Sequence, residues 1–310
     1  MPATAHSEAR SLPDSIPERY ALVRDRIARA AQRAGRSAKD IVLVAVTKTA
    51  EPEQLREMID LGHRDFGENR VQTLLHHAGI VEEYLGRLKI HATSRKGTGP
   101  GSDGSRDASR VVGSQAIPVG SPRAAAGGGG KTPDPPAVRW HMIGHLQRNK
   151  ARKMAEIVRL VHSVDSLRLA EELQAIATRR DEVIDVLVQV NCSGEAQKFG
   201  CPLPAAIPLA EQIDTMVNVR VRGLMTMAAE GETPEDARQA FVRCRELFEE
   251  LKKSGVSPGN INLLSMGMSG DFEVAIEEGA NIVRVGSAIF GEAKREEEPE
   301  APEPGESDEV

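Results

Sequence analysis

The chain has 310 residues, of which 40% are hydrophobic and 28% charged, and its formal net charge is −6. A mean hydropathy of −0.35, with no apolar run of about 18 residues, excludes a membrane-spanning helix. Only 3% of the residues are aromatic and no basic stripe is visible, which argues against nucleic acid as a partner.

Two segments differ in composition from the rest of the chain. Residues 92–137 are rich in Gly, Pro and Ser, and residues 292–310 are dominated by Glu and Pro. Neither segment can bury enough apolar surface to offset the chain entropy lost on ordering. We therefore expect a flexible N-terminus at 1–17, one folded domain at 18–291 interrupted by a disordered insertion at 92–137, and a disordered acidic tail at 292–310.

The cysteines and the N-terminus predict the compartment. Three cysteines without paired spacing argue against a disulfide framework or a zinc cluster, and residues 1–17 lack the apolar core of a secretory signal. His141 and His145 lie four apart on a predicted strand, too far for an ordinary shared metal site, and Cys192 is interpreted as a small packing residue. The sequence thus predicts a cytoplasmic protein without a bound metal.

Short β-branched runs alternate with segments of helical period along the predicted domain. A first helix at 17–34 precedes all strands, and we expect it to cover the floor of the fold. Eight strands are predicted, at residues 41–49, 63–67, 138–144, 160–165, 183–192, 219–227, 260–267 and 281–286. The clearest later helices are predicted at residues 52–61, 69–87, 166–180, 234–254 and 271–278.

This alternation predicts an α/β fold, a single (β/α)8 TIM barrel with an extra N-terminal helix. Parallel strands need helices on their outer face, and closure into a barrel removes the exposed edges. An open doubly wound sheet is the alternative, but no G-x-G-x-x-G motif follows the first predicted strand. In a barrel, the chemistry sits at the carboxyl ends of the strands.

A lysine stands at the end of the first predicted strand. The two-residue period of a strand places Lys48 on the same face as Val42, Val44 and Val46. Burial among valines would lower the pKa of Lys48 and favour the neutral amine, the form that attacks a carbonyl. The alternative is a lysine whose charged end extends to the rim of the barrel.

Glycine and serine residues follow the last two predicted strands. Ser265, Met268 and Ser269 belong to the turn after the seventh strand, and Gly286 and Ser287 to the turn after the eighth. These two turns are the usual phosphate site of the barrel, because backbone N–H groups at the start of a helix face the anion. The alternative is that the glycines only permit tight turns.

An amine opposite a phosphate site suggests a phosphorylated carbonyl compound held as a Schiff base. Both a Schiff-base aldolase acting on a sugar phosphate and a protein that binds pyridoxal 5'-phosphate (PLP) fit this description. Arg284 favours the second, because an arginine at the barrel mouth can donate to the pyridine nitrogen of PLP and keep it unprotonated. The alternative role for Arg284 is a buried ion pair with Asp165 or Glu68.

Eight sequence blocks, taken in order, resemble the YggS/PROSC family of PLP homeostasis proteins; they are residues 44–49, 66–72, 140–150, 162–166, 189–191, 223–225, 264–269 and 283–291. The resemblance implies a barrel like the N-terminal domain of alanine racemase. It also implies the cofactor site, in which Lys48 holds PLP as a Schiff base, Asn69 lies beside it, Arg284 reaches the ring nitrogen, and the phosphate lies among Ser265, Met268, Ser269, Gly286 and Ser287.

The family is generally regarded as carrying and buffering PLP without an established turnover reaction. A racemase of this barrel type needs a second acid/base facing the cofactor, a tyrosine that a further domain supplies in alanine racemase. Tyr20 and Tyr84 both fall on peripheral predicted helices, so we assign no catalytic residue. We predict a monomeric PLP carrier, with apo PLP-dependent enzymes as candidate recipients; the alternative is a racemase-like enzyme acting on amino acids.

Overall fold

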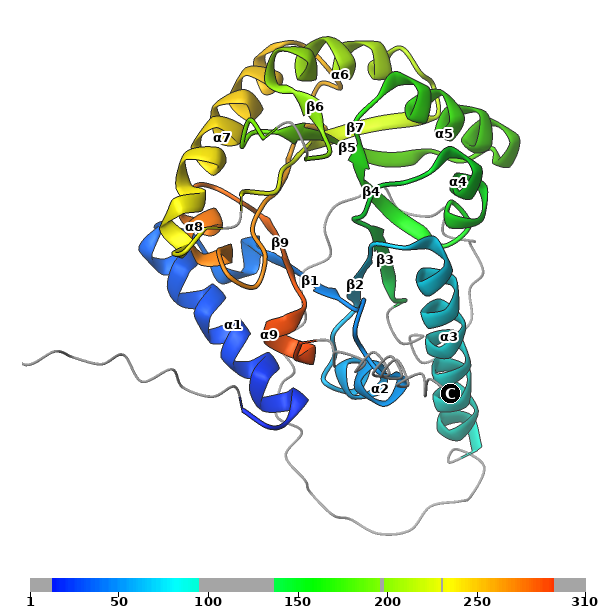
Figure 1. Cartoon of the computed structure of the whole chain (residues 1–310). Coiled ribbons are helices and arrows are strands. Elements are labelled where there is room, and N and C mark those ends of the chain that lie inside the picture. The colour runs from blue at the N-terminus through cyan, green and yellow to red at the C-terminus, as the bar shows by residue number, and fades with distance from the viewer. Residues whose placement is uncertain (1–12, 95–136, 196–197, 230, 293–310) are drawn as a thin grey trace, which may run out of the picture.

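Strands and helices alternate through the described part of the chain, residues 13–94, 137–195, 198–229 and 231–292 of the computed structural model (Figure 1). The strands are β1 (Val42–Val46), β2 (Asp65–Glu68), β3 (Arg139–Met142), β4 (Val158–Val164), β5 (Ile184–Asn191), β6 (Cys201–Pro202), β7 (Val219–Met225), β8 (Leu263–Ser265) and β9 (Ile282–Val285). The α-helices are α1 (Ile16–Arg33), α2 (Pro52–Asp60), α3 (Val71–Ser94), α4 (Arg148–Met154), α5 (Leu167–Arg180), α6 (Ala206–Asp214), α7 (Arg238–Lys253), α8 (Phe272–Glu277) and α9 (Ser287–Phe290). Short 3-10 turns are η1 (Ala38–Asp40), η3 (Leu203–Ala205) and η4 (Pro234–Ala237).

Eight parallel strands close into a barrel, as predicted. The closed ring runs β1-β2-β3-β4-β5-β7-β8-β9 and returns to β1, with β4 paired to β5 and β9 paired to β1. The helices surround this ring (Figure 1). The two-residue strand β6, which the sequence did not predict, pairs only with the end of β5.

Alternation along the strands builds two apolar layers. The inner layer is a compact cluster inside the barrel that consists of Val44, Leu160, Leu187, Met225, Leu263 and Ile282. The outward-facing strand residues join the buried faces of the helices in a larger cluster. The core therefore fills the barrel and the ring around it, and leaves the carboxyl ends of the strands for a site.

The first helix does not cover the barrel floor, so that expectation is wrong. Helix α1 packs in the outer ring against α8, α9 and α2 (Figure 1). Two ion pairs fix it to α8, one between Arg26 and Glu273 at 2.6 Å and one between Arg33 and Glu277 at 2.7 Å. The physical reason is the shortness of α9, whose four residues are too few to cover β9 and β1.

Several predicted boundaries also change. β1 ends at Val46, three residues before the predicted end, and the predicted helix at 234–254 divides into η4 and α7. Helix α3 continues to Ser94, so residues 92–94 of the predicted insertion are helical. Residues 95–136 of that insertion, residues 1–12 and the tail from residue 293 lie outside the described residues. Within the described residues, no helix combines the length and apolarity needed to cross a bilayer.

A buried histidine joins α1 to the barrel. The Nε2–H of His63 donates to the backbone oxygen of Asp65 at 2.7 Å, which leaves Nδ1 to accept from the hydroxyl of Tyr20 at 3.2 Å. The His63 ring also packs edge-on against Tyr20 and Phe66. Acceptance at Nδ1 requires the neutral imidazole, and burial lowers the pKa of His63 from 6.5 to about 4.

This histidine predicts a loss of stability in acid. Between pH 6.5 and pH 4 the unfolded chain takes up a proton at His63 that the folded chain does not, so the free energy of unfolding should fall by about 3 kcal/mol as the pH falls. Urea unfolding at several pH values in this window measures the slope. His63→Gln should lose this part of the slope, while His76→Gln, at an exposed position, should keep it; equal slopes in all three proteins would contradict the assignment.

Candidate functional site

A pocket of about 660 Å³ opens at the carboxyl ends of the strands. Its walls come from the segments that follow β1, β2, β3, β7, β8 and β9, together with the β5–β6 loop. Seven of the eight predicted site residues line it, namely Lys48, Asn69, Met268, Ser269, Arg284, Gly286 and Ser287. The eighth, Ser265, is fully buried and does not line the pocket.

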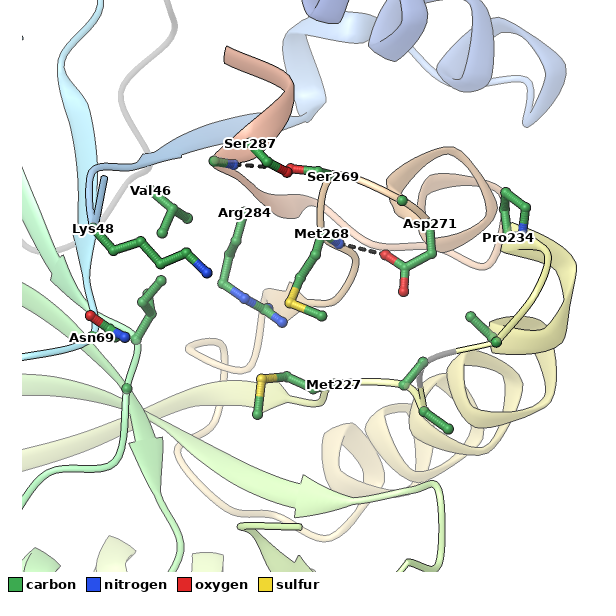
Figure 2. Close-up of a pocket in the computed structure, with 18 of the residues that line it drawn as sticks. Val46, Lys48, Asn69, Met227, Pro234, Met268, Ser269, Asp271, Arg284 and Ser287 are labelled. Atoms are coloured by element: carbon green, nitrogen blue, oxygen red, sulfur yellow. Dashed lines mark hydrogen bonds between the residues drawn. The ribbon is translucent and has the colours of Figure 1, made fainter. Parts of the chain in front are cut away.

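Lys48 enters the pocket from a turn rather than from a strand. The backbone N–H of Thr47 donates to the oxygen of Gly67 at 3.0 Å, and the N–H of Ala50 donates back to Thr47, so the backbone at Lys48 is held on both sides. The Lys48 side chain is exposed and extends into the pocket toward Arg284 (Figure 2). The expectation of a lysine buried among valines is therefore wrong, because β1 ends two residues before it.

Asn69 lies beside Lys48, just after the end of β2, where two loops come very close. A Cβ at Gly144 would lie 2.3 Å from the backbone oxygen of Asn69, so only glycine lets the β3–α4 loop pass. This close approach fixes the backbone of Asn69. The side chains of Lys48 and Asn69 share one wall of the pocket (Figure 2).

The turns after β8 and β9 form a nest of donors. The hydroxyl oxygen of Ser269 accepts from the backbone N–H of Gly286 at 3.2 Å and from that of Ala288 at 3.4 Å. Gly286 also lets β9 lie against β1, because a Cβ there would lie 3.2 Å from the backbone oxygen of Val46. Ser269 Oγ engages these two backbone N–H groups, and the hydroxyls of Ser269 and Ser287 remain as donors where an anion can bind.

Asp271 braces this nest through the β8–α8 turn. Its Oδ1 accepts from the backbone N–H of Met268 at 2.6 Å and so holds the β8–α8 turn. Gly267 begins the turn with φ +88°, and a Cβ there would lie 2.6 Å from that of Ala275. Burial raises the pKa of Asp271 from its usual value.

Arg284 lies at the base of the pocket. Its Nη2 donates to the backbone oxygen of Thr226 at 2.9 Å and its Nη1 donates to the hydroxyl of Ser265 at 2.6 Å. Ser265 therefore lies beneath the pocket and contacts Arg284 from below. Neither Asp165 nor Glu68 is its partner in these hydrogen bonds. Burial lowers the pKa of Arg284 to about 10, and the guanidinium stays protonated at neutral pH.

Part of the wall was not predicted from the sequence. His145 stacks on Phe199 with ring centroids 4.5 Å apart, and both line the pocket. Met227 and the η4 residue Pro234 line the side that faces Lys48 (Figure 2). The β7–η4 loop consists mainly of small residues without a motif, so its sequence carries no signal of a site. In the sequence, Phe199 was visible only as an aromatic residue outside the predicted strands and helices. The structure shows that it is exposed in the β5–β6 loop.

The other residues singled out from the sequence lie elsewhere. His141 is buried inside the barrel beside His162, whereas His145 is at the rim of the pocket, so the two do not face a common centre. Among the described residues, no group of three metal-type ligands comes together. Cys192 is fully buried in the apolar core, as its interpretation as a packing residue predicts.

Known proteins match this chain over nearly its whole length. The family model of the alanine racemase N-terminal domain matches residues 22–294. The pyridoxal phosphate homeostasis protein of Aquifex aeolicus is 36% identical over 279 residues, which cover 89% of this chain and 98% of that protein. The protein of the same name from Pseudomonas aeruginosa is 37% identical over 280 residues, which cover 89% and 95%.

Solved structures agree. An unknown protein from Bifidobacterium adolescentis is 34% identical with a TM-score of 0.69, covering 92% of this chain and 100% of its own. PipY of Synechococcus elongatus, solved with PLP bound, is 28% identical with a TM-score of 0.61, covering 89% and 100%. These matches confirm the resemblance expected from the sequence blocks, and the chain belongs to the alanine racemase N-terminal domain family, among the pyridoxal phosphate homeostasis proteins.

Proposed function

We propose that this chain binds PLP, holds it as a Schiff base on Lys48, and serves PLP homeostasis by storing and carrying the cofactor. The observation that carries the proposal is the meeting of Lys48, the donor nest at Ser269 and the guanidinium of Arg284 in one pocket. Relatives named pyridoxal phosphate homeostasis protein and a similar structure with PLP bound support it.

The pocket offers a partner for each part of PLP. The cofactor supplies an aldehyde that bonds to an amine and a pyridine ring that withdraws electrons. Lys48 offers the amine, the nest around Ser269 and Ser287 binds the phosphate, and Arg284 donates to the ring nitrogen. Asn69 and Met268 lie beside the ring. A protonated Arg284 keeps that nitrogen unprotonated and weakens the electron sink, which suits holding the cofactor better than turnover.

The acid/base groups around the pocket favour a carrier over a racemase. The hydroxyl of Tyr20 donates to His63 and that of Tyr84 to Asp60, so neither faces the pocket. In the described lining the remaining titratable groups are His145, stacked on an aromatic ring, Asp271, bonded to a backbone N–H, and Glu232, exposed on the β7–η4 loop. A racemase-like enzyme is the second candidate, and a turnover measurement separates the two.

We further infer a cytoplasmic monomer that delivers PLP to apo PLP-dependent enzymes. The three cysteines, Cys192, Cys201 and Cys244, are buried free thiols, which suits a reducing compartment. The pocket opens at the carboxyl ends of the strands of a single barrel. Mass measurement in solution and transfer of PLP to an apo enzyme test these two points.

Lys48→Ala should abolish covalent capture of the cofactor. Wild-type protein mixed with PLP should develop a visible absorption band, and borohydride reduction should leave the pyridoxyl group on the peptide that contains Lys48. The matched control is Lys198→Ala, because Lys198 lies near the pocket but donates to the backbone oxygen of Ala228. A colourless wild-type protein, or capture that persists in Lys48→Ala and disappears in Lys198→Ala, would refute the assignment.

Substitution of the nest serines should weaken phosphate recognition selectively. Ser269→Ala and Ser287→Ala each remove a hydroxyl from the nest, and the loss of one hydrogen bond to a charged group should weaken PLP binding about tenfold. Binding of pyridoxal, which lacks the phosphate, should change little. Equilibrium titration of both ligands measures the ratio, with Ser193→Ala as a control outside the lining; an equal loss for both ligands would place the phosphate elsewhere.

The carrier proposal predicts that PLP-loaded protein shows no enzyme-like turnover. Without a positioned acid/base opposite Lys48, steady racemisation of alanine and other amino acids should stay well below about 1 per second. Chiral chromatography of long incubations measures it. Steady racemisation at or above that rate, absent in Lys48→Ala, would establish the racemase-like alternative instead.

A further inference from the structure

Five hydrogen-bonded side chains, called the relay below, cross the barrel interior beneath the pocket. Arg284 Nη1 is 2.6 Å from Ser265 Oγ, and Ser265 Oγ is 3.0 Å from His162 Nδ1. His162 Nε2 is 3.0 Å from His141 Nδ1, and His141 Nε2 is 3.2 Å from Asp65 Oδ1. All five residues are at most 3% exposed. The relay connects the pocket to the carboxylate of Asp65 on β2.

With both imidazoles neutral, the carboxylate end fixes the direction of every hydrogen bond in this relay. Asp65 can only accept, so His141 carries its hydrogen on Nε2 and donates it to Asp65. The bare Nδ1 of His141 then accepts from the Nε2–H of His162, whose own Nδ1 accepts from the hydroxyl of Ser265. Arginine can only donate, so Ser265 also accepts from Arg284. One arrangement therefore satisfies all four contacts with neutral imidazoles.

The pKa shifts of His162 and Asp65 support this arrangement. Burial lowers the pKa of His162 well below its usual value, which keeps its ring neutral. Burial alone would raise the pKa of Asp65, but hydrogen bonds from His141 and Arg139 outweigh it and hold that pKa well below its usual range. Asp65 is therefore a fixed anion, and it polarises the three neutral groups toward itself.

We propose that Asp65, His141, His162 and Ser265 are positioning residues that hold the Arg284 guanidinium in place for the ring nitrogen of PLP; this rests on the proposed function. Within the described residues no carboxylate forms a direct ion pair with Arg284, so the relay connects it to an anion indirectly. Its Nη1 is committed to Ser265 and its Nη2 to Thr226. The guanidinium cannot rotate without breaking the relay.

The barrel contains a matched control. Asp185 on β5 is also buried and accepts from two arginines of β7, from Arg220 at 2.6 Å and from Arg222 at 3.2 Å. Its hydrogen bonds therefore go to arginines and not to a histidine of the relay. Asp185→Asn and Asp65→Asn thus remove the same kind of buried charge, but only Asp65→Asn removes the end of the relay.

The first measurement needs no PLP. Nitrogen-15 NMR of the histidine side chains in the unloaded wild-type protein at pH 7.5 should show His141 and His162 with hydrogen on Nε2 and a bare Nδ1. Ser265→Ala should disturb the His162 signals, and Ser265→Thr, which keeps the hydroxyl, should restore them. A wild-type His162 that carries its hydrogen on Nδ1 would overturn the relay, whether or not the protein binds PLP.

The second measurement compares PLP with 1-deazapyridoxal phosphate, which lacks the ring nitrogen. Asp65→Asn and Ser265→Ala should weaken PLP binding about tenfold and shift its visible band, with little effect on the deaza analogue. Asp185→Asn should leave the ratio of the two affinities unchanged. Equal losses for both ligands, or the same ratio change in Asp185→Asn, would reduce the relay to a structural role, whereas a wild type that binds neither ligand would refute the proposed function alone.

Discussion

The ladder between β1 and β9 sets the geometry on which the pocket depends. In its register Val44 lies opposite Arg284 and Ala45 opposite Val285. Because both strands run in the same direction, the next residues of each chain leave the barrel side by side, and Lys48 emerges next to the turn that begins at Gly286. The amine and the donor nest are therefore neighbours although 238 positions of sequence separate residues 48 and 286. A shift of one residue in this ladder would turn Arg284 away from the interior.

Much of this arrangement follows from the sequence, because the relevant signals are periodic or local. Eight β-branched runs between helical segments predict a closed parallel barrel, because parallel strands need covered outer faces and closure removes the edges. The turns at Ser269 and Gly286 were visible as Gly/Ser motifs before short helices. The sequence did not show where each strand ends or how deep in the barrel each residue lies. Alternation places Lys48 on the face of the inward valines, but it does not say that Lys48 lies beyond its strand. The Gly/Ser motif that contains Ser265 likewise does not say that this serine lies below the pocket floor.

The remaining differences have the same origin in tertiary packing. No local pattern in α1 indicates whether it covers the floor or the side; the four-residue length of α9 decides this by leaving β9 uncovered. The buried polar interior is a further case. The sequence argued against a metal site at His141, but only the neighbouring strands show that His141 and His162 bond to each other.

β3 begins on the side of the barrel away from the pocket. Its first residue, Arg139, lies opposite Asp65, the first residue of β2, and so at the amino ends of the strands. Lys48 and Arg284, in contrast, line the pocket at the carboxyl ends. Ala137 is exposed just before β3, so a fluorescent reporter attached there can follow the molecule without obstructing entry of its ligand.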